Sequence, residues 1–145
     1  MGRILGVDHG ERRIGFALSD PSGIIAMPLK AVTVRSDGEA LNAVVDVCGE
    51  TRAECLVVGL PLSMDGTEGT QAVKVRKFIE QLGPRLSIPI HTWDERLSTS
   101  MIQKMLIEAD VRRDKRKEVV DKLAAQAILQ GYLDSKSMLS DMPES

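Results

Sequence analysis

Residues 3–20 read RILGVDHGERRIGFALSD, and this stretch decides the fold. Its first part, residues 3–8, is an apolar run typical of a buried strand. Residues 12–20 form a second strand, in which Ile14, Phe16 and Leu18 fall on one face. The residues between the two runs are few enough for a tight hairpin turn. The stretch therefore predicts two antiparallel strands, with an acidic residue, Asp8, where the first strand ends.

The segments that follow extend this hairpin into a sheet. A third strand is expected over residues 24–34, where Pro28 favours a position at the sheet edge. The hydrophobic period then alternates between helix and strand. The expected elements are a helix over 37–52 with Asp37 as N-cap, a strand over 55–60, a helix over 70–82 ended by Gly83-Pro84, a strand over 88–93, a helix from Ser98 or Thr99 to about 109, and a helix over 117–134.

This order predicts an α/β fold with a five-stranded mixed sheet. A three-strand antiparallel meander comes first, alternating α and β elements follow, and helices cover both faces. We expect one domain over residues 1–135 and a polar, flexible tail over residues 136–145.

Composition narrows the functional classes. The chain of 145 residues is 43% hydrophobic, enough for one packed core, and no apolar run is long enough to span a membrane. We expect a cytoplasmic protein in which Cys48 and Cys55 are packing residues and not a disulfide. With only two histidines, a zinc site is not expected, so a catalytic metal would be Mg²⁺ or Mn²⁺ held by carboxylates.

The net charge of −2 and the pI of about 5.7 argue against a protein that grips nucleic acid with its whole surface. A local basic patch is still present. Residues 112–117 (RRDKRK) carry five positive side chains and one negative, a net charge of 5 − 1 = +4. We expect these residues to form an exposed loop that borders the cleft of the acidic residues described next.

Acidic residues stand in three apolar contexts. Asp8 ends a strand, the pair Asp94-Glu95 ends another, and Asp121 lies on the apolar side of the final helix. Each has a simpler explanation: a turn-forming Asp, a helix-start cluster, and an interaction with the helix dipole or a nearby lysine. Together they suit phosphodiester hydrolysis by two metals, which needs several carboxylates converging on ions roughly 4 Å apart.

Four motifs together resemble the YqgF family. They are VDHGERRIGFALSD, VVGLPLSMDGTEG, DERLST and VDKLAAQAILQGYL, in the family's order and over nearly the whole chain. The resemblance implies a ribonuclease-H-like fold, shared with Holliday junction resolvases. It also implies maturation of the 5′ end of pre-16S ribosomal RNA, although family members have been regarded as resolvases too.

The resemblance assigns metal and catalytic roles to Asp8, to the Asp94-Glu95 pair and to Asp121, with Glu95 favoured over Asp94. One feature departs from the related resolvases, which place two carboxylates one turn apart on the last helix. Here that position holds Ala124 or Ala125.

Other residues in the motifs are candidates for substrate binding. Arg12 and Arg96 would hold phosphates beside the metal site, and the alternative is a solvated surface charge. The loop with Gly59, Pro61 and Gly66 leads into a helix start that could receive a phosphate, or it is an ordinary connection.

The leading interpretation is a metal-dependent endonuclease acting on structured RNA, with branched DNA as the alternative substrate and ribosomal precursor particles as a possible setting. A non-catalytic nucleic-acid-binding or ribosome-assembly module is the second interpretation. A phosphotransferase of the sugar-kinase type is the third, but that class needs two such domains. Monomer and dimer both stay open.

Overall fold

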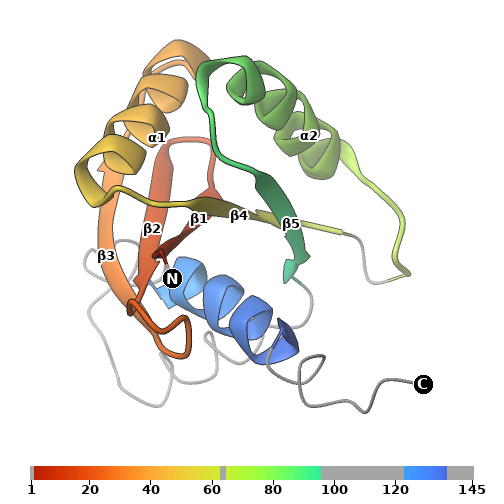
Figure 1. Ribbon diagram of the computed structural model, residues 1–145. Coiled ribbons are helices and arrows are strands. Elements are labelled where there is room, and N and C mark those ends of the chain that lie inside the picture. The colour runs from red at the N-terminus through yellow and green to blue at the C-terminus, as the bar shows by residue number, and fades with distance from the viewer. Residues whose placement is uncertain (1, 63–64, 96–122, 137–145) are drawn as a thin grey trace, which may run out of the picture.

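The computed structural model describes residues 2–62, 65–95 and 123–136 (Figure 1). A five-stranded sheet with the order β3-β2-β1-β4-β5 forms its centre. The labelled elements are β1 (Ile4–His9), β2 (Arg13–Ser19), β3 (Ala26–Thr33), α1 (Asp37–Thr51), β4 (Cys55–Leu60), α2 (Thr70–Leu82), the short 3₁₀ helix η1 (Gly83–Arg85) and β5 (Ile90–Asp94). Residues 123–136 are helical and are called the C-terminal helix below.

The strand pairing confirms the predicted mixed sheet. β1 pairs antiparallel with β2, and β2 pairs antiparallel with β3, which makes the meander. β4 is parallel to both β1 and β5, so the later strands alternate with helices as expected. Pro28 lies in the edge strand β3, where a missing N–H costs no ladder bond with a further strand.

β3 begins two residues later than predicted, and the side chain of Asp20 explains the difference. Its Oδ1 accepts hydrogen bonds from the backbone N–H groups of Ile24 and Ile25, at 2.8 and 2.9 Å. Ser22 donates a further hydrogen bond to the same carboxylate. Residues 24 and 25 therefore belong to the turn that Asp20 closes, and strand pairing resumes at Ala26.

The N-cap of α1 is Ser36, so the prediction of Asp37 was wrong by one residue. Ser36 Oγ accepts from the N–H of Glu39, and Glu39 Oε2 accepts from the N–H of Arg35 at 2.7 Å. The S-x-x-E spacing is that of a capping box, but Glu39 accepts from the residue before the cap and not from Ser36 itself.

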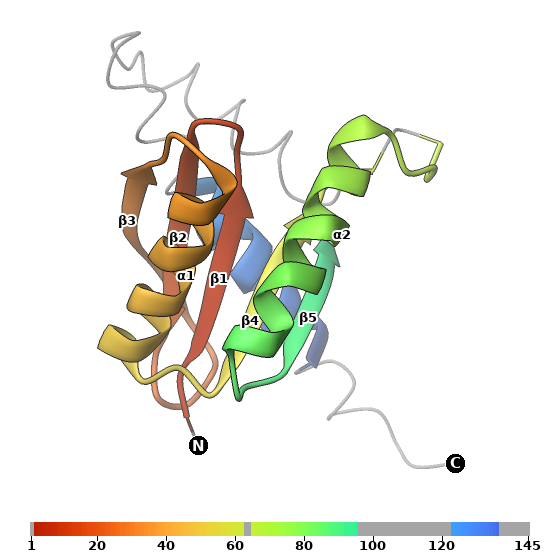
Figure 2. The ribbon, with the colours of Figure 1, turned by 90° about the horizontal axis from the view of Figure 1, so that it is seen from above.

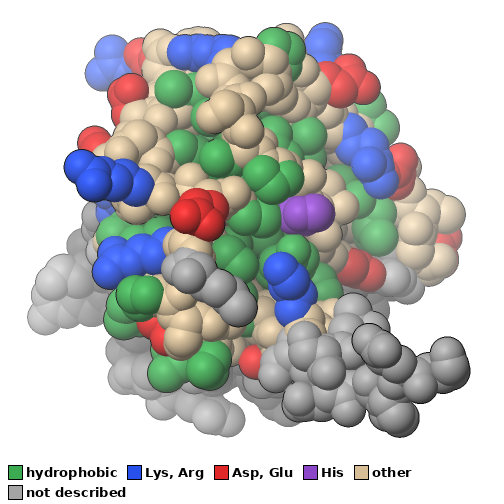
Figure 3. All heavy atoms as spheres, in the orientation of Figure 1, with side chains coloured by type: hydrophobic (Ala, Val, Ile, Leu, Met, Phe, Trp, Pro, Cys, Tyr) green, Lys and Arg blue, Asp and Glu red, His purple; other side chains and the backbone are tan. Residues whose placement is uncertain are grey.

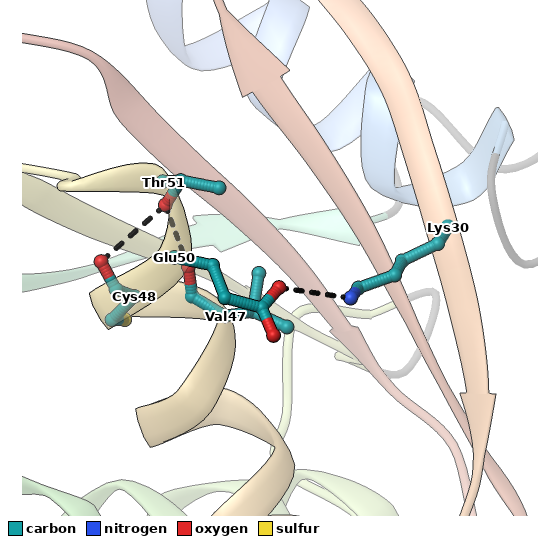
Figure 4. A network of polar contacts seen from close by, with 5 residues as sticks. All are labelled: Lys30, Val47, Cys48, Glu50 and Thr51. Atoms are coloured by element: carbon teal, nitrogen blue, oxygen red, sulfur yellow. Dashed lines mark hydrogen bonds and ion pairs between the residues drawn. The ribbon is translucent and has the colours of Figure 1, made fainter.

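The far end of α1 is joined to β3 at the protein surface (Figure 4). Lys30 Nζ lies 3.1 Å from Glu50 Oε2, and Thr51 Oγ1 donates to the carbonyl of Val47 at 2.7 Å. The ion pair is exposed, so it contributes at most about 1 kcal/mol. Apolar packing, and not this pair, holds α1 on the sheet.

β5 starts at Ile90, two residues after its predicted start. Pro89 has no N–H to offer a neighbouring strand, and its carbonyl accepts from the N–H of Leu56 at 2.9 Å. Ladder pairing then runs from Ile90 opposite Leu56 to Asp94 opposite Leu60.

The two faces of the sheet carry separate apolar clusters, which confirms that helices cover both faces (Figures 1 and 2). The cluster under α1 and α2 includes Leu5, Val7, Phe16, Val58 and Phe78. The cluster under the C-terminal helix includes Ile4, Ala17, Val57, Ile128 and Leu129. Cys48 and Cys55 are both free, as expected.

Small residues allow the C-terminal helix to lie close to the sheet. A Cβ on Gly6 would come within 2.8 Å of Leu129 Cβ and 3.1 Å of the Ala125 carbonyl oxygen. On the helix side, a Cβ on Gly131 would come within 2.9 Å of Trp93 Nε1. At these contacts a larger residue would push the helix off the strands, so the glycines fix its distance from the sheet.

Two glutamines attach the same helix to the β2–β3 turn. Gln130 Oε1 accepts from the N–H of Ala26 at 2.9 Å, and its Nε2 donates to the carbonyl of Ile24 at 2.9 Å. Gln126 Nε2 donates to the carbonyl of Ala26 at 3.0 Å. These bonds set the position of the helix along the sheet.

Several predictions fall outside the described residues. They are the helix over 98–109, the basic residues 112–117, the part of the final helix before residue 123, and the tail after residue 136. The final helix continues to residue 136, two residues beyond its predicted end. Among the described residues, none of the helices has the length and apolar character that crossing a membrane requires.

Candidate active site

Asp8 lies near the carboxyl end of β1, on the face that the C-terminal helix covers. Side chains alternate along a strand, and Val7 belongs to the apolar cluster on the opposite face. His9 turns back toward that opposite face, where its ring centroid lies 4.4 Å from that of Phe78 in α2. His9 and Asp8 therefore point to opposite faces of the sheet.

Glu95 reaches the same place from β5. Trp93 packs in the cluster under the C-terminal helix. Glu95 comes two residues later and therefore points to the same face of the sheet. The side chains of Glu95 and Asp8 share a hydrogen bond. The structure thus brings together two of the carboxylates singled out in the sequence, which are 87 positions apart (95 − 8 = 87).

Gly59 in β4 makes this contact possible. β4 lies between β1 and β5 in the sheet, and Gly59 is opposite Trp93 in the register. A Cβ on Gly59 would come within 2.6 Å of Glu95 Oε1 and 2.9 Å of Glu95 Cγ. Because Gly59 has no side chain, Glu95 can cross β4 and meet Asp8.

The environment of Glu95 favours its protonated form. Burial raises the pKa of Glu95 well above its ordinary value of 4.5, and the hydrogen bond to Asp8 raises it further. Repulsion from the negative charges of Asp8 and Asp94 acts in the same direction. A partly buried carboxyl pair of this kind is one of the arrangements that mark functional sites in proteins.

Asp94 lies on the other side of the pleat. It is opposite Leu60 in the register, and Leu60 packs in the cluster under α1 and α2. Alternation along the strand therefore separates Asp94 from the carboxyl pair. The other two predicted polar residues of this site, Asp121 and Arg96, lie outside the described residues.

Within residues 2–62, 65–95 and 123–136, no group of three or more potential metal ligands is found. The described site is a pair, Asp8 and Glu95, and both ligands would donate oxygen. Ala124 and Ala125 are the two positions compared above with the second helix carboxylate of related resolvases; both are buried, and the carbonyl of Ala125 is close to Gly6 of β1. Packing against β1 leaves little room for a larger side chain there.

Three of the predicted substrate-binding residues lie in turns and loops of the described structure. Arg12 is exposed in the β1–β2 turn, and Pro61 is half-buried directly after β4. Gly66 is exposed with a φ of 89°, in a turn where Asp65 Oδ1 accepts from the N–H of Thr67 at 3.0 Å. Sequence reasoning missed the contact of Gly59 with Glu95, although a glycine inside an apolar strand is a sign of close approach.

Charge is mixed on the visible surface. In Figure 3, lysine and arginine side chains alternate with acidic ones and do not gather into one field. An electrostatic footprint for a polyanion is therefore not provided by the described residues on this face.

Comparison with solved structures shows that the fold is shared with Holliday junction resolvases. The chain superposes on Thermus thermophilus RuvC in complex with a Holliday junction with a TM-score of 0.61, at 12% identity over 95% of this chain and 97% of that one. The yeast mitochondrial resolvase Ydc2 gives a TM-score of 0.58 at 12% identity, over 96% and 80% of the two chains. The expected ribonuclease-H-like architecture is confirmed.

Sequence relatives are much closer. A protein of Desulforamulus reducens named "Putative pre-16S rRNA nuclease" is 49% identical over 92% of this chain and 97% of its own length. A protein of the same name from Thermoanaerobacter pseudethanolicus is 48% identical, over 92% and 97% of the two chains. The family model described as RuvX, Holliday junction resolvase, matches residues 2–135. The chain therefore belongs to the RuvX family, the family that its four motifs identified under the name YqgF.

Proposed function

We propose that this protein is a metal-dependent endonuclease that cleaves phosphodiester bonds in the 5′ region of the small-subunit ribosomal RNA precursor. The observation that carries the proposal is the meeting of Asp8 and Glu95 beside the C-terminal helix. The names of the relatives at 44–49% identity supply the substrate.

The carboxyl pair fits a divalent cation. Asp8 and Glu95 are partly buried against each other, so their negative charges would repel each other. Without a cation, this repulsion is removed only when Glu95 holds a proton. Carboxylate oxygens suit Mg²⁺ or Mn²⁺ better than zinc. We assign Asp8 and Glu95 as ligands and, from the family motif, Asp121 as the third. Asp94 ranks below Glu95 because it points to the opposite face of the sheet.

A divalent cation held there would stabilise the negative charge that develops on the phosphate and would increase the acidity of an attacking water. The chain's own part is to hold the carboxylates in place. Asp8 pairs with Gly15 of β2 and directly follows the last residue of β1 that pairs with β4, and Glu95 is held over Gly59. Whether one or two cations take part depends on Asp121 and on the substrate phosphate.

The remaining predicted residues would bind the substrate. Arg12 in the β1–β2 turn and Arg96 directly after Glu95 are proposed to contact phosphates on either side of the scissile bond. Pro61 and Gly66 belong to the loop after β4, which would border the same substrate. Residues 112–117 are proposed to attract the polyanion.

The test is a cleavage assay with the full-length protein. The substrates are a labelled precursor fragment spanning the 5′ end of 16S ribosomal RNA and a four-way DNA junction, each with Mg²⁺, Mn²⁺ or EDTA. We expect cleavage of the RNA that EDTA abolishes. Cleavage of the junction alone would establish the second candidate, a resolvase, which the family's description favours. Binding of RNA without cleavage of either substrate would support an assembly module instead.

A further inference from the structure

A cavity of about 510 Å³ lies on the face of the sheet opposite the carboxyl pair. Figure 2 shows α1 and α2 diverging toward the β1–β2 turn. The cavity is lined from these three segments, by residues that include His9, Glu11, Asp37, Gln71, Lys77 and Phe78. Its volume is within the range of small-molecule sites in proteins. The proposed mechanism uses none of these side chains.

The cavity and the carboxyl pair are separated only by the end of β1. Asp8 and His9 are consecutive, so their α-carbons are about 3.8 Å apart and their side chains point to opposite faces. His9 lines the cavity, and Asp8 faces the C-terminal helix. The cavity and the carboxyl pair therefore lie at the same end of β1, on opposite faces of the sheet.

The lining is mixed in a way that matches a nucleotide. Phe78, Val34 and Ala40 are buried residues that supply an apolar part. The amides of Gln71 and Gln81 and the carboxylates of Glu11 and Asp37 supply hydrogen-bonding groups that can accept from, or donate to, a base edge. An inorganic anion has no apolar surface to pack against Phe78, Val34 and Ala40, and the carboxylates of Glu11 and Asp37 would repel it.

The positive charge in the lining is only partly neutralised. Glu11 Oε1 accepts from Gln71 Nε2 at 2.9 Å and lies 3.4 Å from Lys74 Nζ, so Lys74 is paired. Among the described residues, no acidic partner is recorded for Lys77. The five charged residues of the lining, Arg35, Lys74, Lys77, Glu11 and Asp37, sum to 3 − 2 = +1.

We propose that this cavity receives one nucleotide of the substrate strand, next to the bond cut at Asp8 and Glu95. The inference deepens the proposed function and rests on it for the identity of the strand. The base lies toward Phe78 and the glutamines, and the phosphate meets Lys77. Single-stranded RNA suits this mode because its bases can be splayed out into pockets, whereas a base in a duplex cannot.

The test measures binding without cleavage, in EDTA. The affinity of the full-length protein for a short labelled single-stranded RNA is compared for wild type, Lys77→Gln, Ala40→Leu and Lys30→Gln. Lys77→Gln removes an exposed positive charge from the lining, and Ala40→Leu fills the apolar part. Lys30→Gln is the matched control, because Lys30 is absent from this cavity and pairs with Glu50.

We expect Lys77→Gln to weaken RNA binding about tenfold, the effect of one charge-assisted contact. The slope of log affinity against log salt should fall by about one in the same variant. Lys30→Gln should change neither quantity. Guanosine monophosphate at millimolar concentration should compete with the RNA and shift the side-chain amide NMR signals of Gln71 and Gln81, whereas inorganic phosphate should not.

The proposal that the cavity binds a nucleotide of the substrate strand is overturned if Lys77→Gln binds RNA with the same affinity and salt slope as Lys30→Gln. It is also overturned if the monophosphate binds in the cavity while Lys77→Gln leaves RNA affinity unchanged, because the cavity would then hold a free nucleotide and not the substrate strand. Thermal unfolding of each variant shows that the fold is intact. Cleavage by a protein whose Lys77→Gln variant binds normally would leave the nuclease proposal standing and remove the subsite alone.

Discussion

The side chain of Glu95 lies directly over the α-carbon of Gly59, so close that a Cβ on Gly59 would be 2.6 Å from Glu95 Oε1. Gly59→Ala should therefore displace Glu95 from Asp8. A displacement of 1 Å in a catalytic group can reduce the rate about 100-fold. We expect a loss of that order in kcat for precursor RNA cleavage.

The same substitution also meets the side chain of Ile128, whose Cδ1 would be 2.4 Å away. Gly59→Ala with Ile128→Val removes that methyl group, so the double variant should regain stability without regaining activity. Gly49→Ala is the matched control, because nothing lies within 4 Å of a Cβ there and the residue is in α1. It should be active and about 0.5–1 kcal/mol more stable. A fully active Gly59→Ala variant would contradict the positioning of Glu95 by Gly59.

Asp8→Asn should abolish metal-dependent cleavage and leave the fold intact. Asn keeps the size of the side chain but removes the charge that a divalent cation needs. The loss should be on the order of 1,000-fold, because a metal contributes several kcal/mol to stabilising the transition state. Cleavage is measured with Mg²⁺ and with EDTA, and Asp46→Asn on the exposed side of α1 is the control. Activity that survives both EDTA and Asp8→Asn would rule out the metal mechanism.

Glu95→Gln should make the metal-free protein more stable and inactive. The wild-type site holds two carboxyl groups against each other, whereas an amide can donate a hydrogen bond to Asp8 without a competing negative charge. We expect a gain of roughly 0.5–2 kcal/mol in the free energy of unfolding in EDTA at neutral pH. Urea unfolding measures it, with Glu80→Gln on the exposed side of α2 as the control. A destabilised Glu95→Gln protein would mean that Asp8 and Glu95 do not oppose each other in the native state.

Cys48 should make stability depend on alkaline pH. Burial raises the pKa of the Cys48 thiol from 9.0 to about 11. Between these two values the unfolded thiol loses its proton while the folded thiol keeps it, so wild-type stability falls as pH rises through this window, at no more than about 1.4 kcal/mol per pH unit. Cys48→Ala lacks this dependence and loses packing at every pH. The stability difference between wild type and Cys48→Ala should thus narrow from pH 9 to pH 11, and a constant difference would show that the thiol is not protected.

The fold could be predicted from the sequence because its strongest signals are local. Period-two and helical patterns, with Gly83-Pro84 as a stop, gave the type of each described element and the limits of β4 and α2. Two of the errors at element ends occurred where a side chain binds the backbone, and the late start of β5 follows Pro89. Asp20 extends the turn before β3, and Ser36 replaces Asp37 as the cap of α1.

The site could be predicted only in part, because its residues are distant in the sequence. The preference for Glu95 over Asp94 came from a family resemblance, and strand alternation with the bond to Asp8 now supports it. Gly59 can make room for Glu95 only because β4 lies between β1 and β5, and no local sequence pattern reveals this strand order. The cavity beside His9 depends on the spacing of α1 and α2, which is also invisible in the sequence.

The packing of the C-terminal helix on Gly6 has a consequence for protein synthesis. β1 leaves the ribosome early, whereas the helix that covers Ile4, Ala17 and Val57 is made after more than a hundred further residues. Contacts of such long sequence separation form late and slowly in folding. Until residues 123–136 have been made, this helix cannot cover that face of the sheet or pack beside Asp8. A nascent chain that ends before residue 123 therefore lacks the helix that covers the Asp8 face of the sheet.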